Sequence, residues 1–339
     1  MKPRIFRIDP QNIDFGLIKQ AAAVLNNRGL VAFPTETVYG LGANALDPKA
    51  VAGIFEAKKR PLDDPLIVHI ADIEDFHRLV AEIPAVAEKL VNCFWPGPLT
   101  VILKKTALVP DIVTTGLETV AVRMPSGEIA RSFIKAAGVP VAAPSANMFG
   151  RPSPTTAQHV IDDLDGRIDV LLDGGRTDIG VESTVVEVVG GRIVVLRPGG
   201  VSVEELESVA GPVEVLSGSE DMLKSPGKYP CHYSPRARVI LVEDDLSQVD
   251  TVASVVAAMK EIGKRTAVMA TQENARSYKG VDVKVLGPGN DGKICASRLF
   301  HVLREFDAEK VEVIVAEGIP EKGLGLAVMN RLRKAAGPS

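Results

Sequence analysis

Two apolar runs that flank a pair of glycines constrain the fold of this chain more than any other feature. The runs occupy residues 183–189 and 192–197, and Gly190-Gly191 lies between them. Such a glycine pair is typical of a tight β-hairpin, because both central residues of the turn take positive φ. Elsewhere strand-like runs alternate with helical segments. An antiparallel hairpin among them predicts an α/β domain with a mixed sheet.

The hydrophobic pattern also predicts several further elements before the linker. A helix is expected at 15–28 with Gly29 as its C-cap, and another to about residue 58, with Asp47 as N-cap and Pro48 as first residue. Further predictions are a helix at 129–137 closed by Gly138, and strands at 29–33, 66–70, 100–103, 120–124, 139–143 and 170–173. Since proline cannot donate to a sheet ladder, the strand that contains Pro140 is expected at an edge or irregular.

A second alternation of strands and helices begins after a linker. Residues 216–238 are rich in turn formers but too aromatic for a passive spacer. We therefore expect a first domain at 1–212, a linker at 213–237 and a small doubly wound domain at 238–339. In the last domain, strands are expected at 238–242, 266–270, 283–287 and 311–315, and helices at 252–262, 296–306 and 325–336.

Composition excludes several classes of protein. Of 339 residues, 46% are hydrophobic, and the net charge of −4 argues against a strongly basic nucleic-acid binder. The cysteines, Cys93, Cys231 and Cys295, lack zinc spacing, so free thiols in a reducing compartment are expected. The first residues do not resemble a signal peptide, and no apolar run approaches the roughly 20 residues of a membrane helix. We expect a cytoplasmic protein without a membrane partner.

Three polar loops, each attached to an apolar strand, carry the candidate site. They lie at residues 34–42, 58–69 and 144–147, and the second has three cations at 58–60 before Pro61 and Pro65. Each loop also has a purely structural interpretation, in which the cations complement a helix C-terminus and the hydroxyls stabilise turns. An arginine at a strand end, such as Arg123 or Arg197, can simply extend its head into water. Together, polar residues at the ends of several strands favour a binding crevice.

No covalent nucleophile is evident in the sequence. There is no G-x-S-x-G elbow, no H-E-x-x-H and no Walker A or G-x-G-x-x-G loop. The glycines at 287–292 follow a strand with the wrong spacing for a dinucleotide site and predict a turn. Chemistry at the candidate site would therefore rest on positioning and on cations.

Seven ordered blocks resemble the YrdC/Sua family of L-threonylcarbamoyladenylate synthases, in the long form with a C-terminal domain. The blocks lie at residues 34–42, 58–69, 94–100, 122–125, 144–154, 180–184 and 197–199. The resemblance implies a YrdC-like twisted mixed sheet with flanking helices, plus a smaller Rossmann-like domain. It also implies a nucleotidyltransferase that converts L-threonine, bicarbonate and ATP, with Mg²⁺, into threonylcarbamoyl-AMP and pyrophosphate. The product would serve threonylcarbamoyl-transfer proteins that modify tRNA beside the anticodon.

The same resemblance assigns residues to each substrate. For L-threonine it implies Thr37, His69, Arg123, the Ala143 backbone and Ser183. For ATP it implies Lys58, Arg60, Asp64, Thr119, Ser145, Ser153, Arg197 and Tyr233, with Lys58 and Arg60 as the catalytic cations. Arg123 suits the threonine carboxylate because its planar fork matches that geometry. Tyr233 would make the linker a flap over the site, and no protein-held metal is expected.

Two departures from the family pattern stand out. Position 64 is commonly Asn in the family and is Asp64 here, and a carboxylate beside a triphosphate costs repulsion unless it is compensated. In the linker, residues 228–231 differ from the family pattern. No contacts are therefore assigned to residues 228–231.

Two other functions fit parts of the pattern. One is an RNA-binding or ribosome-assembly module, which the acidic charge disfavours, although weak RNA binding stays among the expectations. The other is a carbamoyltransferase subunit like the hydrogenase-maturation proteins, which carry cysteine-rich zinc modules that this chain lacks.

Overall fold

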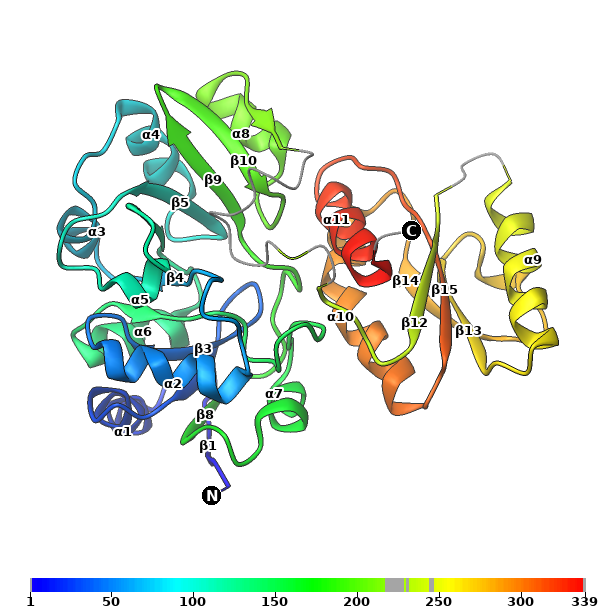
Figure 1. The fold of residues 1–339 in the computed structure, drawn as a ribbon, viewed down its shortest axis with the longest axis horizontal. Coiled ribbons are helices and arrows are strands. Elements are labelled where there is room, and N and C mark those ends of the chain that lie inside the picture. Colours follow the sequence, from blue (N-terminus) through cyan, green and yellow to red (C-terminus); the bar gives the residue numbers. More distant parts are fainter. Residues whose placement is uncertain (1, 217–228, 230–231, 244–246, 338–339) are drawn as a thin grey trace. The chain divides into compact units, whose positions relative to one another are not determined.

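The computed structural model describes residues 2–216, 229, 232–243 and 247–337. These residues form two compact units, each described here by itself (Figure 1). Two short segments that precede the linker, residues 150–153 and 179–181, group with the second unit rather than the first. Most of the linker predicted at 213–237, including residues 217–228, lies outside the described residues.

The first unit is built on one mixed sheet of eleven strands. Across the sheet the order is β1 (Arg4–Arg7), β8 (Val170–Asp173), β2 (Val31–Pro34), β3 (Tyr39–Asn44), β7 (Val141–Ala142), β4 (Ile67–His69), β6 (Thr119–Arg123), β5 (Leu99–Lys104), β9 (Thr184–Val189), β10 (Arg192–Arg197) and β11 (Glu214–Val215). Parallel pairs such as β4–β6 and β5–β9 alternate with antiparallel pairs such as β5–β6. The predicted α/β class with a twisted mixed sheet is confirmed.

The glycine hairpin that anchors this prediction is present. Strands β9 and β10 pair antiparallel, with Val189 opposite Arg192. Gly190 and Gly191 take φ values of 58° and 78°, the left-handed region that a two-residue hairpin turn requires.

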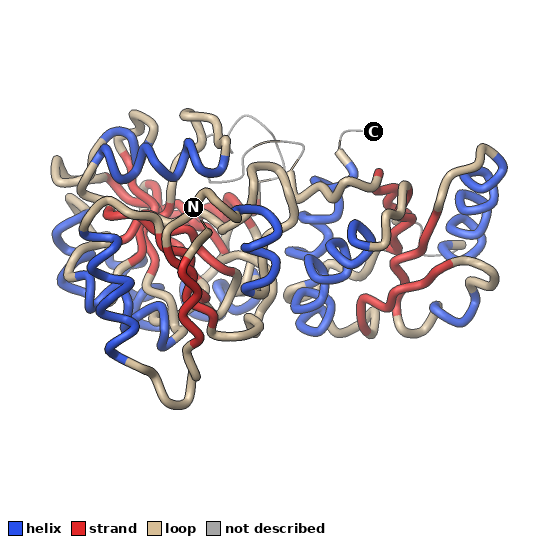
Figure 2. The backbone as a smooth tube through the Cα atoms, turned by 90° about the horizontal axis from the view of Figure 1, so that it is seen from below, coloured by secondary structure: helices blue, strands red, loops and turns tan. Residues whose placement is uncertain are grey.

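Helices cover both faces of this sheet (Figure 2). They are α1 (Phe15–Asn26), α2 (Pro48–Lys58), α3 (Ile73–Leu79), α4 (Ala85–Phe94), α5 (Asp111–Thr114), α6 (Glu128–Ala137), α7 (Ala157–Leu164) and α8 (Val203–Ala210). Neighbouring residues of one strand separate the two cores: Phe33 packs with α1 and α6, whereas Ala32 belongs to the core shared by the other helices. Helices α1 and α6 contact β2, and α1 also contacts β3 and β8, so they cover one face at one end of the sheet.

The predicted helix signals hold with one correction. Asp47 caps α2, accepting a hydrogen bond from the Lys49 N–H at 2.9 Å, and Pro48 is the first residue of the helix. After α1, however, Arg28 takes the left-handed conformation expected of Gly29. Gly29 serves a close approach instead, because a Cβ there would lie 2.5 Å from Val24 Cγ1.

The strand predicted around Pro140 is central rather than at an edge. Strand β7 pairs with β3 on one side and β4 on the other. It is only two residues long and begins after Pro140, so the missing N–H lies outside the ladder and the proline is tolerated.

The second unit is a parallel sheet of four strands between helices. Its order is β12 (Arg238–Val242), β15 (Val313–Glu317), β13 (Thr266–Thr271) and β14 (Asp282–Gly287). The helices are α9 (Gln248–Glu261), the 3₁₀ turn η2 (Ala275–Ser277), α10 (Gly292–Ala308) and α11 (Gly325–Ala336). Within the unit, α9 lies on one side of the sheet and α10 and α11 on the other (Figure 1), which confirms the doubly wound prediction.

The two segments that precede the linker, residues 150–153 and 179–181, pack within this second unit. Arg151 pairs with Asp307 at 2.8 Å, and Gly180 approaches α10 so closely that a Cβ would lie 2.5 Å from Ser297 Cα. None of the helices in the described ranges is long and apolar enough to cross a bilayer.

Candidate active site

A row of polar side chains crosses five adjacent strands of the first unit. His69 on β4 lies opposite Arg123 on β6, and Thr100 follows on β5. The Thr100 Oγ1 lies 2.8 Å from the Ser183 Oγ, just before β9, and the Arg197 Nη2 at the end of β10 donates to the same Ser183 Oγ at 3.3 Å. The row therefore joins side chains up to 128 positions apart in the sequence.

The row lies on the sheet face that α1 and α6 cover only in part. The His69 ring meets the Phe33 ring edge-on at 6.3 Å, so the row begins where the core under those helices ends. Beside it is an apolar floor of buried side chains from the same strands: Ile67, Ala121, Ile102, Val185 and Leu196. A ligand with both polar and apolar parts suits such a surface.

The residues assigned to the two substrates lie toward opposite ends of β4 and β6. Arg123 ends β6, whereas Thr119 begins it, about 13 Å away at the usual rise of a strand, on the same face. Ser145 follows β7, which runs antiparallel to β4 and so leads away from His69. Arg197 is the exception, because it is assigned to ATP but contacts Ser183.

Arg123 is held by a carboxylate that the sequence analysis did not assign. Its Nη2 donates to Glu36 Oε1 at 2.7 Å, and its Nε donates to the Gly97 carbonyl at 3.3 Å. Burial opposes ionisation of Glu36, but the charge and hydrogen bond of Arg123, helped by nearby backbone N–H groups, outweigh it and lower the pKa of Glu36. The signal for Glu36 was present, since it stands between Thr35 and Thr37 in a polar turn.

The turn between β2 and β3 orders these neighbours. The Thr35 hydroxyl donates to the Val38 carbonyl at 2.7 Å, so the structural interpretation of Thr35 as a turn residue holds. Its oxygen also lies 2.8 Å from the Thr37 Oγ1, which is buried beside it. The Thr37 side chain is thus held in place, but it is not the group that closes the turn.

His69 is neutral near pH 7. Burial, followed by the nearby charge of Arg123, lowers its pKa to about 3. Its Nδ1 is buried and makes no hydrogen bond to any described residue. A neutral imidazole in this position can orient a hydroxyl group but is a poor proton acceptor at neutral pH.

Lys58 joins two of the predicted loops. It is buried, and its Nζ donates to the carbonyls of Ser145 and Asn147, each at 2.5 Å. The same loop is tied to β3, because the Ala146 N–H donates to the Tyr39 carbonyl at 2.8 Å. The ammonium therefore fixes the loop that follows β7.

Arg60 is folded back onto its own loop. Its Nη2 lies 2.9 Å from Asp64 Oδ2 and donates to the Pro65 carbonyl at 2.9 Å, while its Nε donates to the Asp64 carbonyl at 3.1 Å. The unusual carboxylate at position 64 is thus compensated by the arginine four residues before it.

The remaining assigned residues are placed as follows. The Ala143 N–H donates to the Ile67 carbonyl at 2.9 Å, beside the apolar floor. Ser153 and Tyr233 belong to the second unit and are described only within it. There the Tyr233 ring stacks on Phe300 at 5.5 Å, with the Arg331 guanidinium over its face at 5.0 Å.

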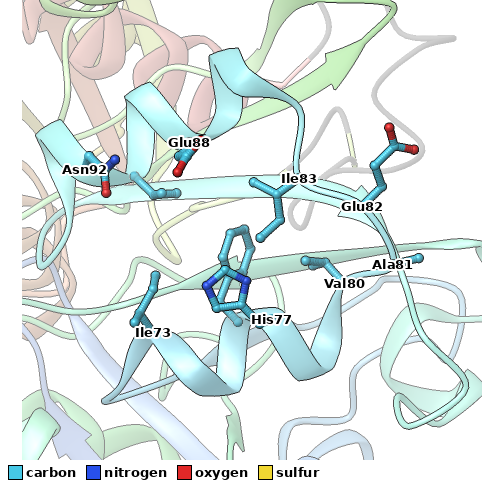
Figure 3. A pocket seen from close by; sticks show the side chains of 10 residues that line it. Ile73, His77, Val80, Ala81, Glu82, Ile83, Glu88 and Asn92 are labelled. Carbon is cyan, nitrogen blue, oxygen red and sulfur yellow. The ribbon is translucent and has the colours of Figure 1, made fainter.

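A separate cavity of about 390 Å³ lies between α3 and α4 (Figure 3). Its apolar lining includes Phe76 and Ile83, and His77 faces Glu88 across it. None of the residues assigned to a substrate lines this cavity. No cluster of three or more His, Cys, Asp or Glu side chains that could hold a metal occurs among the residues the structure describes.

This arrangement defines an α/β protein with a candidate small-ligand site, made of fixed cations and hydroxyls, on a mixed sheet. The comparisons with known proteins give the particular family. The Sua5/YciO/YrdC family model, described as "Telomere recombination", matches residues 23–199, and one described as "Threonylcarbamoyl-AMP synthase, C-terminal domain" matches 201–337. The chain therefore belongs to the Sua5/YciO/YrdC family, in the two-domain form of the threonylcarbamoyl-AMP synthases, as the resemblance implied.

Individual relatives match this sequence over nearly its whole length. Proteins named threonylcarbamoyl-AMP synthase from Pyrococcus abyssi and Bacillus subtilis are 50% and 48% identical, covering 96% and 97% of this chain and 96% and 94% of their own length. The crystal structure of P. abyssi Sua5 complexed with L-threonine is 48% identical, covers 98% of this chain and 97% of that one, and superposes with a TM-score of 0.92.

Proposed function

We propose that this chain forms threonylcarbamoyl-AMP and pyrophosphate from L-threonine, bicarbonate and ATP. The observation that carries the proposal is the polar row from His69 to Arg197 beside an apolar floor. It occurs in a chain whose relatives of similar length are named for this activity.

L-threonine would bind at the Arg123 end of the row. The P. abyssi relative has been crystallised with L-threonine, which supports this substrate. Arg123 would pair with the carboxylate, and neutral His69, Thr37 and Ser183 would surround the side-chain hydroxyl. The Ala143 N–H is already bonded within the sheet, so its backbone would contact threonine through the carbonyl.

ATP would extend from this end along β4 and β6. Lys58 and Arg60 would supply positive charge to the phosphates, and Thr119, Ser145 and Arg197 would contact the nucleotide, as would Asp64 in its Arg60-bound form. Ser153 and Tyr233 are also proposed to contact the nucleotide. We expect Mg²⁺ to enter with the phosphates, whose oxygens are its usual ligands.

The chemistry needs no covalent intermediate on the protein. The threonine amine, once neutral, attacks bicarbonate with loss of water, or its dehydrated form, carbon dioxide, with loss of a proton, to give the carbamate. A carbamate oxygen then attacks the α-phosphorus as pyrophosphate leaves. Charge develops on phosphate oxygens, where fixed cations stabilise it most. We place the reaction in the cytoplasm, with transfer proteins carrying the threonylcarbamoyl group to tRNA, and expect at most weak RNA binding.

Pyrophosphate release by purified protein with ATP and Mg²⁺ tests the proposal, with threonine or bicarbonate left out in turn. We expect release only when both are present. Release without either would indicate a plain ATPase. No release from folded protein that binds ATP would contradict the synthase assignment.

A further inference from the structure

We propose that Glu36 holds the ammonium group of the amino-acid substrate, so that Glu36 and Arg123 together clamp a zwitterion. This inference rests on the proposed function, which makes threonine the ligand at this end of the row. The inference gives a role to Glu36, which lies in the block at 34–42 but was not assigned to a substrate by the family resemblance.

The first observation is an unused acceptor on Glu36. The side chain is 7% exposed, and Oε1 receives the hydrogen bond from Arg123. The other oxygen, Oε2, is buried and accepts no well-aligned hydrogen bond from the described part of the chain, although the backbone N–H groups of Glu36 and Ser126 lie near the carboxylate. A buried charged oxygen left without a partner costs free energy, so a ligand donor at this point would be favoured.

The second observation is an unused donor on Arg123. This guanidinium is 4% exposed, and Nε and Nη2 donate to Gly97 and Glu36. Its Nη1 donates to none of the described residues. Arginine has five N–H donors in a fixed fork, so Arg123 can bind a second carboxylate while it keeps Glu36.

An open acceptor beside an open donor matches an α-amino acid. The ligand carboxylate would meet Nη1 of Arg123, and its ammonium, one carbon away, would meet Oε2 of Glu36. The turn between β2 and β3 orients the Glu36 carboxylate. Thr35, just before Glu36, is hydrogen-bonded to Thr37 and Val38, which follow it. Gly127 allows this turn to approach α6, because a Cβ there would lie 3.3 Å from the Glu36 nitrogen.

The clamp predicts selection for the ammonium group itself. The clamp is fully charged at neutral pH, since the pKa of Glu36 is lowered. A 2-hydroxy acid of the same shape keeps the carboxylate but offers no positive charge to Oε2. Loss of one charge-assisted hydrogen bond weakens binding by about 10- to 100-fold.

The test compares L-threonine with its analogue 2,3-dihydroxybutyrate of matching configuration, titrated calorimetrically into wild-type protein and Glu36→Gln. Wild type should bind the analogue about 10- to 100-fold more weakly than threonine. Glu36→Gln should weaken threonine by a similar factor and leave the analogue within about threefold, which removes the discrimination. Glu187→Gln, which changes another buried carboxylate of this sheet, should behave like wild type.

Other outcomes separate this inference from the proposed function. Equal loss of both ligands in Glu36→Gln would mean that Glu36 only positions Arg123, and would overturn the clamp. Should this variant not fold, wild type decides alone, because equal binding of the two ligands overturns the clamp. Threonine-dependent pyrophosphate release alongside such a result would leave the synthase assignment intact, whereas absence of threonine binding would remove both.

Discussion

The Arg60 guanidinium lies 2.9 Å from the Asp64 carboxylate, with their side chains only 4% and 0% exposed. The pair is neutral overall, so much of the positive charge that Arg60 would present to a triphosphate is offset within its own loop. The charge of the side chain at position 64 therefore determines how much positive charge Arg60 can present to a triphosphate.

Asp64→Asn should strengthen ATP binding. The amide keeps an oxygen to accept from Arg60 but removes the negative charge, so KM for ATP is expected to fall by about three- to tenfold. Stability should fall by about 1–3 kcal/mol, because the buried Arg60 guanidinium loses its ion-pair partner and keeps only a neutral one. The measurement is pyrophosphate release against ATP concentration, with Asp63→Asn as control, since Asp63 is exposed and loses the same charge. A rise in KM specific to Asp64→Asn would show that Asp64 itself favours nucleotide binding.

Lys58→Met should lower the free energy of unfolding of the first unit. It should also lower activity, because Lys58 is proposed to supply positive charge to the phosphates. Methionine fills a similar volume but leaves the carbonyls of Ser145 and Asn147 without the ammonium that now bonds them. Buried acceptors that lose a charged donor cost about 2–5 kcal/mol together. Urea unfolding followed by Trp95, the single tryptophan, reports on this unit.

The matched control for Lys58→Met is Lys59→Met at the adjacent exposed position. This variant should leave the free energy of unfolding within about 0.5 kcal/mol of the wild-type value. Wild-type stability in Lys58→Met would refute the structural role of this ammonium.

Local patterns predicted much of the fold because each depends on neighbours in sequence. The Gly190-Gly191 turn and the Asp47 cap need only a few residues, and both are confirmed. The central place of β7 could not be predicted, because it depends on two partners, β3 and β4, from distant parts of the chain.

The candidate site shows the same division. Polar residues after apolar strands indicated where the site lies, but not which side chains pair within it. Glu36 and Arg123 are 87 positions apart, and only the sheet order brings them together. Thr100 was also missed, because a lone threonine in an apolar strand is unremarkable until the register places it beside Ser183.

Gly199→Ala should impair the site without touching a polar side chain. A Cβ there would lie 2.3 Å from the Glu182 carbonyl oxygen and 2.4 Å from the Thr184 nitrogen, so the backbone at Ser183 must move. Activity is expected to fall at least about tenfold, since such a shift misplaces the groups around Ser183. Gly53→Ala is the control, because a Cβ there meets only Leu30 at ordinary contact distance within a helix. Unchanged turnover in Gly199→Ala would show that the backbone around Ser183 can accommodate a Cβ at position 199 without harm to the site.

His69 should make the first unit sensitive to acid. Its pKa is about 3 in the folded chain because of burial and then the charge of Arg123, against an ordinary value of 6.5. Between these values the unfolded chain binds a proton that the folded chain does not, so stability rises with pH and is lost as pH falls below about 6.5. From pH 7 to pH 5 this amounts to about 2 kcal/mol.

His69→Gln should remove this part of the pH dependence, because glutamine does not titrate. Urea unfolding followed by Trp95 at pH 7 and pH 5 gives the two free energies for each protein. The wild-type loss on acidification should exceed the loss in the variant by about 2 kcal/mol, while all other titrating groups contribute equally to both. His77→Gln, which changes an exposed histidine on α3, should keep the wild-type loss. Equal losses in wild type and His69→Gln would mean that His69 takes up its proton in the folded protein near its ordinary pKa of 6.5, and would refute the lowered pKa of this imidazole.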